Sequence, residues 1–119
     1  HQLAQALTDD SAPVRRNAAE ALGTTGQTDD SIVPAVASLL HDEQYWVRDN
    51  AARTLAKMGT AAESAVSALQ CALNDENRYV RFNVAMALKQ IGTSTAHQVL
   101  FDHLFMSRWC PLTTRDSSF

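Results

Sequence analysis

Apolar residues recur along this chain with the spacing of an α-helix. From Val47 they advance in steps of three and four positions, which places them on one stripe of a helix. That stripe comprises Val47, Ala51, Ala52, Leu55 and Met58, and the same spacing returns as Val80, Val84, Ala85, Leu88 and Ile91. We predict an all-helical protein without strands, with helices at about residues 1–8, 12–24, 31–41, 45–58, 62–74, 78–91 and 95–107.

Residues that begin and end helices stand at the edges of these segments. Ser11 and Asn77 precede two of the stripes and can accept hydrogen bonds from first-turn N–H groups. Gln44 holds the equivalent place in the middle of the chain and is a poorer cap. Each stripe then runs out to a glycine that can end the helix, at Gly26, Gly59 and Gly92.

The stripes belong to a repeat with a fixed interval. The pair Val-Arg occurs at 14–15, 47–48 and 80–81, a step of 33 residues each time (47 minus 14, and 80 minus 47). Leucine, aspartate, asparagine, alanine and glycine landmarks keep the same step. A short period held over three copies predicts a stacked-repeat fold. We expect a right-handed α/α superhelix, or solenoid, of antiparallel helix pairs joined by short links.

The period sets the expected domain organisation. We predict one domain over residues 1–108, with repeats at about 1–26, 27–59 and 60–92, a capping helix within 93–108, and a tail at 109–119. The cap departs from the repeat, because Asp102 stands where Val36 and Leu69 stand in earlier copies. Its apolar residues are more than one neighbour can bury. We expect either that the tail around Trp109 folds over the cap or that two chains associate through it.

The unit Leu-x-Asp-x₄-Val-Arg-x-Asn-Ala-Ala-x-x-Leu-x₃-Gly resembles HEAT repeats, over roughly residues 1–95. More closely, it resembles the short HEAT-like repeats named after phycobilisome lyases, which also occur in scaffolding proteins. The resemblance implies that its Asp and Arg are structural and bridge turn and helix. It pairs Asp9 with Arg15, Asp42 with Arg48, and Asp75 with Arg81. A guanidinium can hold turn carbonyls and a carboxylate at once, so these residues would form a ladder.

Composition narrows the classes of function. The 119 residues carry a net charge of −3, which gives no basic face for nucleic acid. No apolar run approaches the length of a membrane span. Two Cys residues are too few for a disulfide framework, so a cytoplasmic protein is expected.

No combination of residues predicts catalysis, a metal site or a cofactor. The Asp–Arg pairs occur in triplicate, which is unlike an active site. The histidines do not recur with the period, and His97 and His103 are six residues apart, so they do not share a helical face as an i, i+4 pair would. The repeated asparagines are expected to bond neighbouring turns, at Asn17, Asn50 and Asn83.

A binding surface is predicted on the second helix of each pair. Positions that point away from the core differ between copies, whereas core positions agree. In a solenoid, the second helices line the concave surface used for binding. This face gathers aromatic residues, Met and Arg, which are enriched at binding hot spots. The predicted binding residues are Trp46, Asp49, Arg53, Tyr79, Phe82 and Met86. The alternative for Trp46 and Tyr79 is that they pack on adjacent helices, as a large residue at that position often does.

We therefore expect a non-enzymatic scaffold or adaptor that binds another protein or a peptide, with no nucleic acid or membrane partner. An alternative is an accessory subunit of a phycobilin lyase-like system for chromophore attachment, which the family resemblance allows. DNA binding ranks last, because the exposed positions are mixed in sign around an apolar centre.

Overall fold

Helices make up all the regular structure of the residues that the computed structural model describes, which are 5–25 and 31–109, with side chains as far as residue 105. No strand occurs in these two ranges. In chain order the elements are α2 (Ala12–Thr25), α3 (Ile32–Ser38), η1 (Leu39–His41), α4 (Tyr45–Met58), η2 (Gly59–Ala65), α5 (Val66–Ala72), α6 (Arg78–Ile91) and α7 (Ser94–Trp109).

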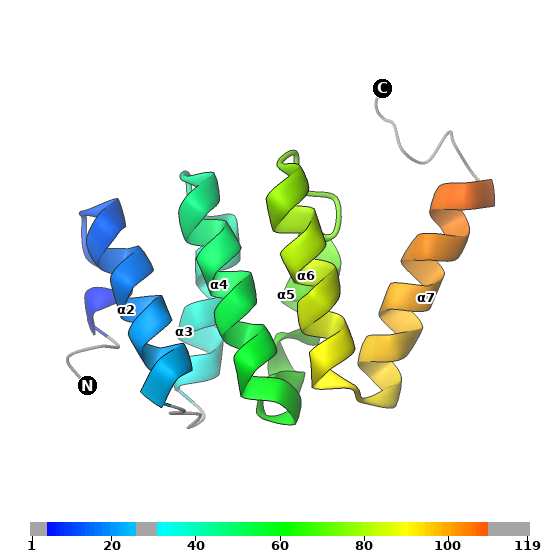
Figure 1. Ribbon diagram of the computed structural model, residues 1–119, viewed down its shortest axis with the longest axis horizontal. Coiled ribbons are helices and arrows are strands. Elements are labelled where there is room, and N and C mark those ends of the chain that lie inside the picture. Colours follow the sequence, from blue (N-terminus) through cyan, green and yellow to red (C-terminus); the bar gives the residue numbers. More distant parts are fainter. Residues whose placement is uncertain (1–4, 26–30, 110–119) are drawn as a thin grey trace.

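The helices stack along one axis. Helices α2, α4 and α6 run side by side as one layer, and the shorter α3 and α5 lie behind them (Figure 1). The molecule measures 45 × 29 × 17 Å, which is elongated along the stack. The predicted all-helical solenoid is confirmed.

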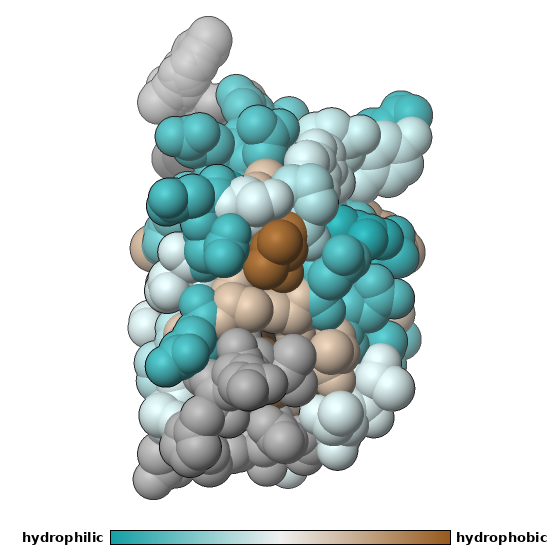
Figure 2. Space-filling model, turned by 90° about the vertical axis from the view of Figure 1, so that its left-hand side faces the viewer, coloured by the Kyte–Doolittle hydropathy of each residue, from teal (hydrophilic) through white to brown (hydrophobic). Residues whose placement is uncertain are grey.

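The core consists of the positions that recur with the period. Leu22, Leu55 and Leu88 are each fully buried between the two layers. Val47 and Val80 are also fully buried, whereas Val14 is 39% exposed. Val14 lies on α2, at the end of the stack, where no second helix among the described residues covers it. Figure 2 shows that end of the molecule, with an apolar centre that has polar side chains on either side of it.

The predicted helix boundaries agree with the structure for the second helices. Asn77 Oδ1 accepts hydrogen bonds from the backbone N–H groups of Tyr79 and Val80, whereas Gln44 makes no side-chain cap. Gly59 and Gly92 end α4 and α6 with φ of 60° and 72°, which side chains with a Cβ rarely adopt. Gly26 lies outside the described residues.

The first helices of the pairs differ from the prediction. The apolar spacing predicts continuous helices at 31–41 and 62–74, but each is a seven-residue α-helix joined to a 3₁₀ segment. Ala62 has φ −92° and ψ 15°, which interrupts the helical path within η2. A 3₁₀ turn keeps apolar residues three apart on one side. The apolar spacing alone therefore does not distinguish it from an α-helix.

Candidate functional site

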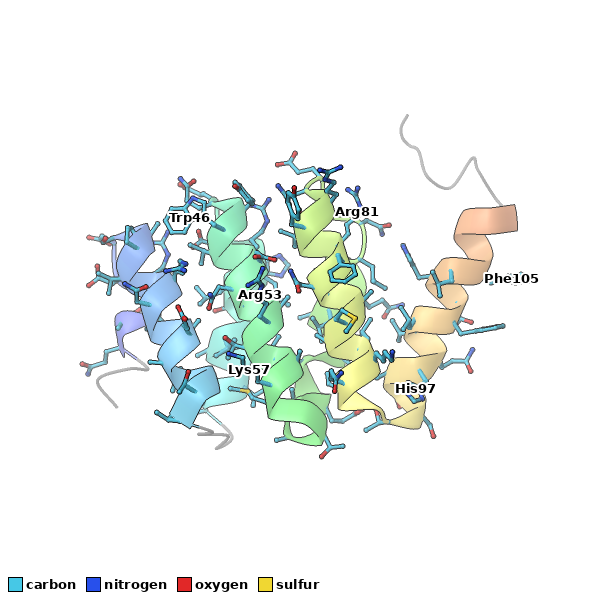
Figure 3. All side chains as sticks on the ribbon, viewed as in Figure 1. Trp46, Arg53, Lys57, Arg81, His97 and Phe105 are labelled. Carbon is cyan, nitrogen blue, oxygen red and sulfur yellow. The ribbon has the colours of Figure 1, made fainter. Side chains whose placement is uncertain are left out.

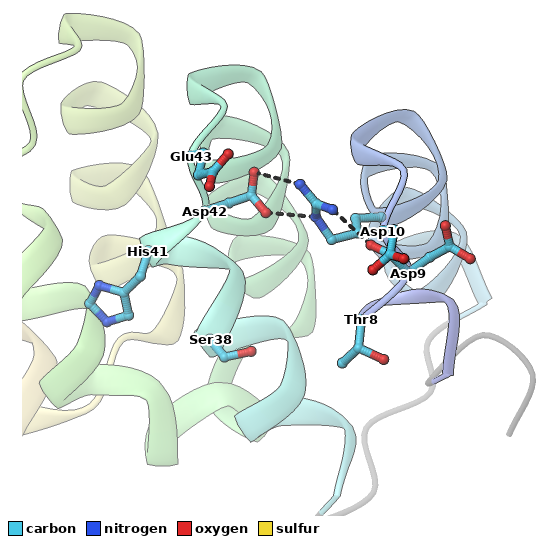
Figure 4. A pocket seen from close by; sticks show the side chains of 8 residues that line it. Thr8, Asp9, Asp10, Ser38, His41, Asp42 and Glu43 are labelled. Carbon is cyan, nitrogen blue, oxygen red and sulfur yellow. Dashed lines mark hydrogen bonds and ion pairs between the residues drawn. The ribbon is translucent and has the colours of Figure 1, made fainter.

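Arginine side chains connect neighbouring helix pairs at the turns that precede the second helices. Arg15 of α2 reaches Asp42 in the next turn, with Nε 2.7 Å from Oδ1 and Nη2 donating to Oδ2 over 3.2 Å. Its Nη1 donates to the backbone carbonyl of Asp9 over 2.7 Å. Dashed lines in Figure 4 mark these contacts. One guanidinium thus holds a carbonyl of its own turn and a carboxylate of the following one.

Arg48 of α4 repeats this arrangement with greater burial. Its Nε lies 2.8 Å from Asp75 Oδ2 and forms an ion pair with it, although this N–H group makes no hydrogen bond among the described residues. Its Nη2 donates to Asp75 Oδ1, and its Nη1 donates to the Asp42 carbonyl over 2.8 Å. The side chains of Arg48 and Asp75 are each only 10% exposed.

The carboxylate pairing predicted within each copy is therefore wrong. Asp9, Asp42 and Asp75 give their backbone carbonyls, not their carboxylates, to the Arg six residues later. The carboxylates instead accept hydrogen bonds from N–H groups two residues on, at Ser11, Gln44 and Asn77. Because that bond turns the carboxylates of Asp42 and Asp75 into their turns, the free side of each faces the preceding second helix and meets Arg15 or Arg48 there.

Arg81 occupies the same place in the period but has no carboxylate partner among the residues that the structure describes. Its Nη1 donates to the Asp75 carbonyl over 2.7 Å, and its side chain is exposed. No Asp or Glu of the described residues lies within ion-pair distance of it. The reason is that α7 runs as a continuous helix through Trp109, so the next acidic turn is missing.

Electrostatics within the ladder favour the charged guanidinium. The hydrogen bond to Asp42 raises the pKa of Arg15 above its usual value, more than partial burial lowers it. The same hydrogen bond therefore stabilises the charged form of Arg15 in its ion pair with Asp42.

The asparagines of the repeat do not bond neighbouring turns as predicted. Asn17 accepts a hydrogen bond from Arg16, and Asn83 donates to the Asp49 carboxylate and to the Tyr79 carbonyl. Asn50 Oδ1 is buried and has no hydrogen-bond partner among the described residues. One sequence position thus has three different environments.

The predicted binding residues divide into exposed and packed side chains. Phe82 is 64% exposed and Tyr79 is 53% exposed, with Arg78 lying 5.1 Å from the centroid of the Tyr79 ring. Met86 is partly buried. Trp46 differs from the prediction, because it is partly buried and packs against the core, between α2 and α4 (Figure 3). A large residue on α4 meets the neighbouring α2, whereas Phe82 projects from α6 into solvent.

A groove lies between α4 and α6 and brings together several of these residues. It is open, has a volume of about 480 Å³, and has mainly apolar walls. Its lining residues are Arg53, Ala56 and Lys57 of α4, and Phe82, Asn83, Met86 and Gln90 of α6. Three of the six predicted binding residues, Arg53, Phe82 and Met86, therefore share one site. Trp46, Asp49 and Tyr79 do not line it.

Asp49 connects the two helices beside the groove. Its carboxylate accepts a hydrogen bond from Asn83 of α6 and lies 3.3 Å from Nη2 of Arg53, one turn further along α4. The Asp49 side chain is 17% exposed and that of Arg53 is 60% exposed. Asp49 is thus occupied by contacts within the protein, whereas Arg53 remains available to solvent.

Sequence reasoning missed how closely α2 approaches α4. A Cβ added to Gly23 would lie 3.3 Å from Lys57 Cδ and 3.4 Å from Thr54 Cγ2. Buried Thr54 donates from its hydroxyl to the Ala19 carbonyl of α2 over 2.9 Å. The sequence did contain a sign of this close approach, since Thr54 is a polar residue within the apolar stripe of α4. The absence of a Cβ at Gly23 leaves room for the stem of Lys57 against α2.

Helix α7 has an exposed apolar face. Phe101 and Phe105 stack with ring centroids 6.2 Å apart, and Leu104 lies between them in sequence. All three are about half exposed or more. Figure 3 shows Phe105 pointing away from the rest of the stack. The tail that the sequence predicts to cover this helix lies outside the described residues, apart from Trp109 at the end of α7.

A second cleft, of about 460 Å³, lies on the side of the acidic turns (Figure 4). It is lined by Thr8, Asp9, Asp10, Arg15, Ser38, His41, Asp42 and Glu43. Within residues 5–25 and 31–109, no group of three or more His, Cys, Asp or Glu is arranged to hold a metal ion. No helix in these ranges is long and apolar enough to cross a membrane.

Comparisons with known proteins agree with this architecture. A family model described as HEAT repeats matches residues 1–70. Among solved structures, a chain of the complex of CpcE and CpcF of phycocyanin lyase from Nostoc sp. PCC7120 is similar, with a TM-score of 0.77 and 28% identity. The match covers 96% of this chain and 46% of that one, so this chain spans about half the length of its structural relative. A search of curated proteins finds no match.

Proposed function

Because this chain belongs to the HEAT repeat family, we propose that it is a non-enzymatic scaffold or adaptor module that binds another protein or a peptide. The partner docks on the outward face of α4 and α6. The observation that carries this proposal is Phe82, which is 64% exposed at the edge of the groove between these helices. Large aromatic side chains beside Met and Arg are typical of binding hot spots.

The proposal uses no catalytic group, cofactor, nucleic acid or membrane. Its site residues are Arg53, Phe82 and Met86, with Lys57 and Gln90 added from the groove. A cytoplasmic location belongs to the same proposal, because two Cys residues do not make a disulfide framework. The Asp–Arg ladder supports the helices on which the site lies and contacts no partner.

Two phenylalanines of equal exposure give a matched test. Phe82 is 64% exposed on α6, and Phe101 is 63% exposed on α7. Partners are captured from an extract of the source organism by the unmodified chain, by Phe82→Ala and by Phe101→Ala, and are quantified by mass spectrometry. We expect Phe82→Ala to weaken a specific partner by about tenfold or more, and Phe101→Ala to retain it.

The opposite result, with loss only on Phe101→Ala, would move the site to α7. Retention by both variants would rule out both faces. Circular dichroism should show unchanged helical content, because both side chains are exposed. Trp46→Ala is a poor test, since Trp46 packs against the core.

A second candidate function is an accessory subunit of a chromophore lyase. It is favoured by the structural match to a phycocyanin lyase chain over 96% of this protein. Incubation of the chain with a phycocyanin subunit and its bilin, with and without a CpcF-type partner, tests it. Covalent pigment on the subunit that depends on this chain would support the candidate. Unchanged attachment when the chain is omitted would argue against it.

We also propose that two copies of this chain associate through α7. This association is supported by the exposed Phe101, Leu104 and Phe105. Sedimentation of the intact chain beside a chain ending at Ser107 tests it, with Leu104→Ala as a variant of the intact chain. A monomer in all three, at equal stability, would contradict both self-association and a tail folded over the cap.

A further inference from the structure

Charge is distributed unevenly between the two helix layers. The whole chain has 10 Lys and Arg, 13 Asp and Glu, and a net charge of −3. Yet α2 has two Arg and one Glu, α4 has two Arg, one Lys and one Asp, and α6 has two Arg, one Lys and no acidic residue. Helices α3 and α5 have no charged residue. The front layer is therefore positive in a negative protein, and its charge increases along the stack to α6.

Part of this positive charge is neutralised inside the protein. Arg15 and Arg48 are bound by the carboxylates of Asp42 and Asp75, near the first turns of the second helices. The cations further along α4 are different. Arg53 and Lys57 line the groove, and no Asp or Glu lines it with them. Asp49, the carboxylate that contacts Arg53, is 17% exposed and is also bonded to Asn83.

The opposite wall of the groove supplies an apolar surface. Phe82 and Met86 of α6 lie one turn apart on the same side of the helix and line the groove together with Arg53 and Lys57 of α4. Phe82 is more exposed than the other large apolar side chains at the surface of the front layer, which are Val14, Tyr45 and Tyr79. A ligand that fits this groove needs an apolar group for α6 and negative charge for α4.

We propose, on the basis of the proposed function, that the partner presents a peptide segment with Asp or Glu beside a large apolar side chain. The carboxylate binds Arg53 and Lys57, and the apolar side chain packs on Phe82 and Met86. The carboxylate displaces water from two exposed cations, and Arg53 can bind it through two parallel N–H groups. Burial of the apolar side chain supplies most of the affinity.

A short acidic segment fits this surface better than a nucleic acid does. Acidic residues at the turns border the same layer, at Asp42, Glu43, Asp75 and Glu76. A nucleic acid, with a phosphate at every nucleotide, would bring negative charge close to these acidic residues. A peptide with one or two carboxylates would contact only the groove. Nucleic-acid sites usually have an extended basic face, and this chain is negative overall.

Selection from a library of random dodecapeptides displayed on phage tests the partner chemistry directly, and it does not require that the natural partner be identified. The intact chain is the bait, and Phe82→Ala serves for counter-selection. We expect the enriched peptides to carry Asp or Glu next to, or one helical turn from, Leu, Ile, Phe or Trp. Synthetic copies should bind about tenfold more weakly to Arg53→Ala or Phe82→Ala, measured by fluorescence anisotropy. Phe101→Ala should bind them normally.

Charge reversal gives the sharpest control. Lys57→Glu should weaken the selected acidic peptides and strengthen copies in which Lys replaces the acid, while circular dichroism remains unchanged. Higher salt should weaken binding of the acidic peptides and affect their Gln copies less.

Two results would overturn the inference. Enrichment of Phe82-dependent peptides without acidic residues would leave the proposed function standing and refute the partner chemistry. Binding of a short DNA duplex more tightly than any selected peptide would show a polyanion surface instead. The absence of any Phe82-dependent peptide would count against the docking face itself, so the failure of the two proposals can be distinguished.

Discussion

Arg48 and Arg81 occupy the same position of the repeat but have different surroundings. Both donate to the backbone carbonyl of the Asp six residues earlier. Arg48 also meets Asp75 of the following turn and is 10% exposed, whereas Arg81 is exposed and has no carboxylate partner among the described residues. The difference shows that a residue of this repeat gains its partner from the next unit. The sequence position alone fixes only the bond to its own turn.

The same contrast applies to the aromatic residues of the front layer. Trp46 has α2 on one side and packs against the core, whereas Tyr79, at the same position of the next copy, is 53% exposed. Large aromatic residues on equivalent helices therefore serve packing in one pair and remain exposed in the next. Substitutions of Arg48 and Arg81 can therefore measure how much stability the neighbouring helix pair contributes. Both arginines make the same bond to the backbone, which serves as an internal reference.

The largest expected effect is that of Arg48→Ala. The substitution removes the ion pair with Asp75 and the bond to the Asp42 carbonyl, and leaves a nearly buried carboxylate without its partner. We expect the free energy of unfolding to fall by about 1–3 kcal/mol, measured by urea denaturation. Unchanged stability would refute a structural role for the ladder, and loss of partner binding in such a stable variant would make it functional.

Asp75→Asn should have an intermediate effect. Asn keeps an oxygen for the Asn77 N–H group and for Arg48 Nη2, but it places an N–H group where Oδ2 met Arg48 Nε. Glu76, 3.9 Å from Arg48, can compensate part of the lost charge. We expect a loss of about 1 kcal/mol in the free energy of unfolding. A loss as large as that of Arg48→Ala would show that charge outweighs the remaining hydrogen bonds.

The sequence was sufficient to locate the second helices. The predicted helices at 45–58 and 78–91 coincide with α4 and α6, since a full apolar stripe and a terminal glycine both mark them. The first helices were predicted too long, because a 3₁₀ turn and an α-helix share the apolar spacing used to find them. The residues at which these helices end depend on the tertiary contacts of the following turn, which the local sequence does not specify.

The ladder and the site were only partly predictable. Asp42 is six residues from Arg48 and 27 from Arg15, and the period is compatible with either pairing. Only the three-dimensional stack decides between them. Exposure of Phe82 follows from its helical face, but the groove beside it depends on the distance between α4 and α6. The path of the Lys57 stem depends on Gly23 in another helix, which no pattern within α4 reveals.

Arg81→Ala has the smallest expected effect and isolates the bond that both arginines share. Within the described part of the chain, Arg81 makes one hydrogen bond, to the Asp75 carbonyl, and its side chain is exposed. Exposed contacts of this kind contribute little, because water replaces them, so we expect a loss of no more than about 0.5 kcal/mol in urea denaturation. The difference between Arg48→Ala and Arg81→Ala then measures what burial and the neighbouring carboxylate add. If the two variants lost equal stability, the bond to the backbone would account for the whole effect. The pairing between successive helix pairs would then have no energetic role.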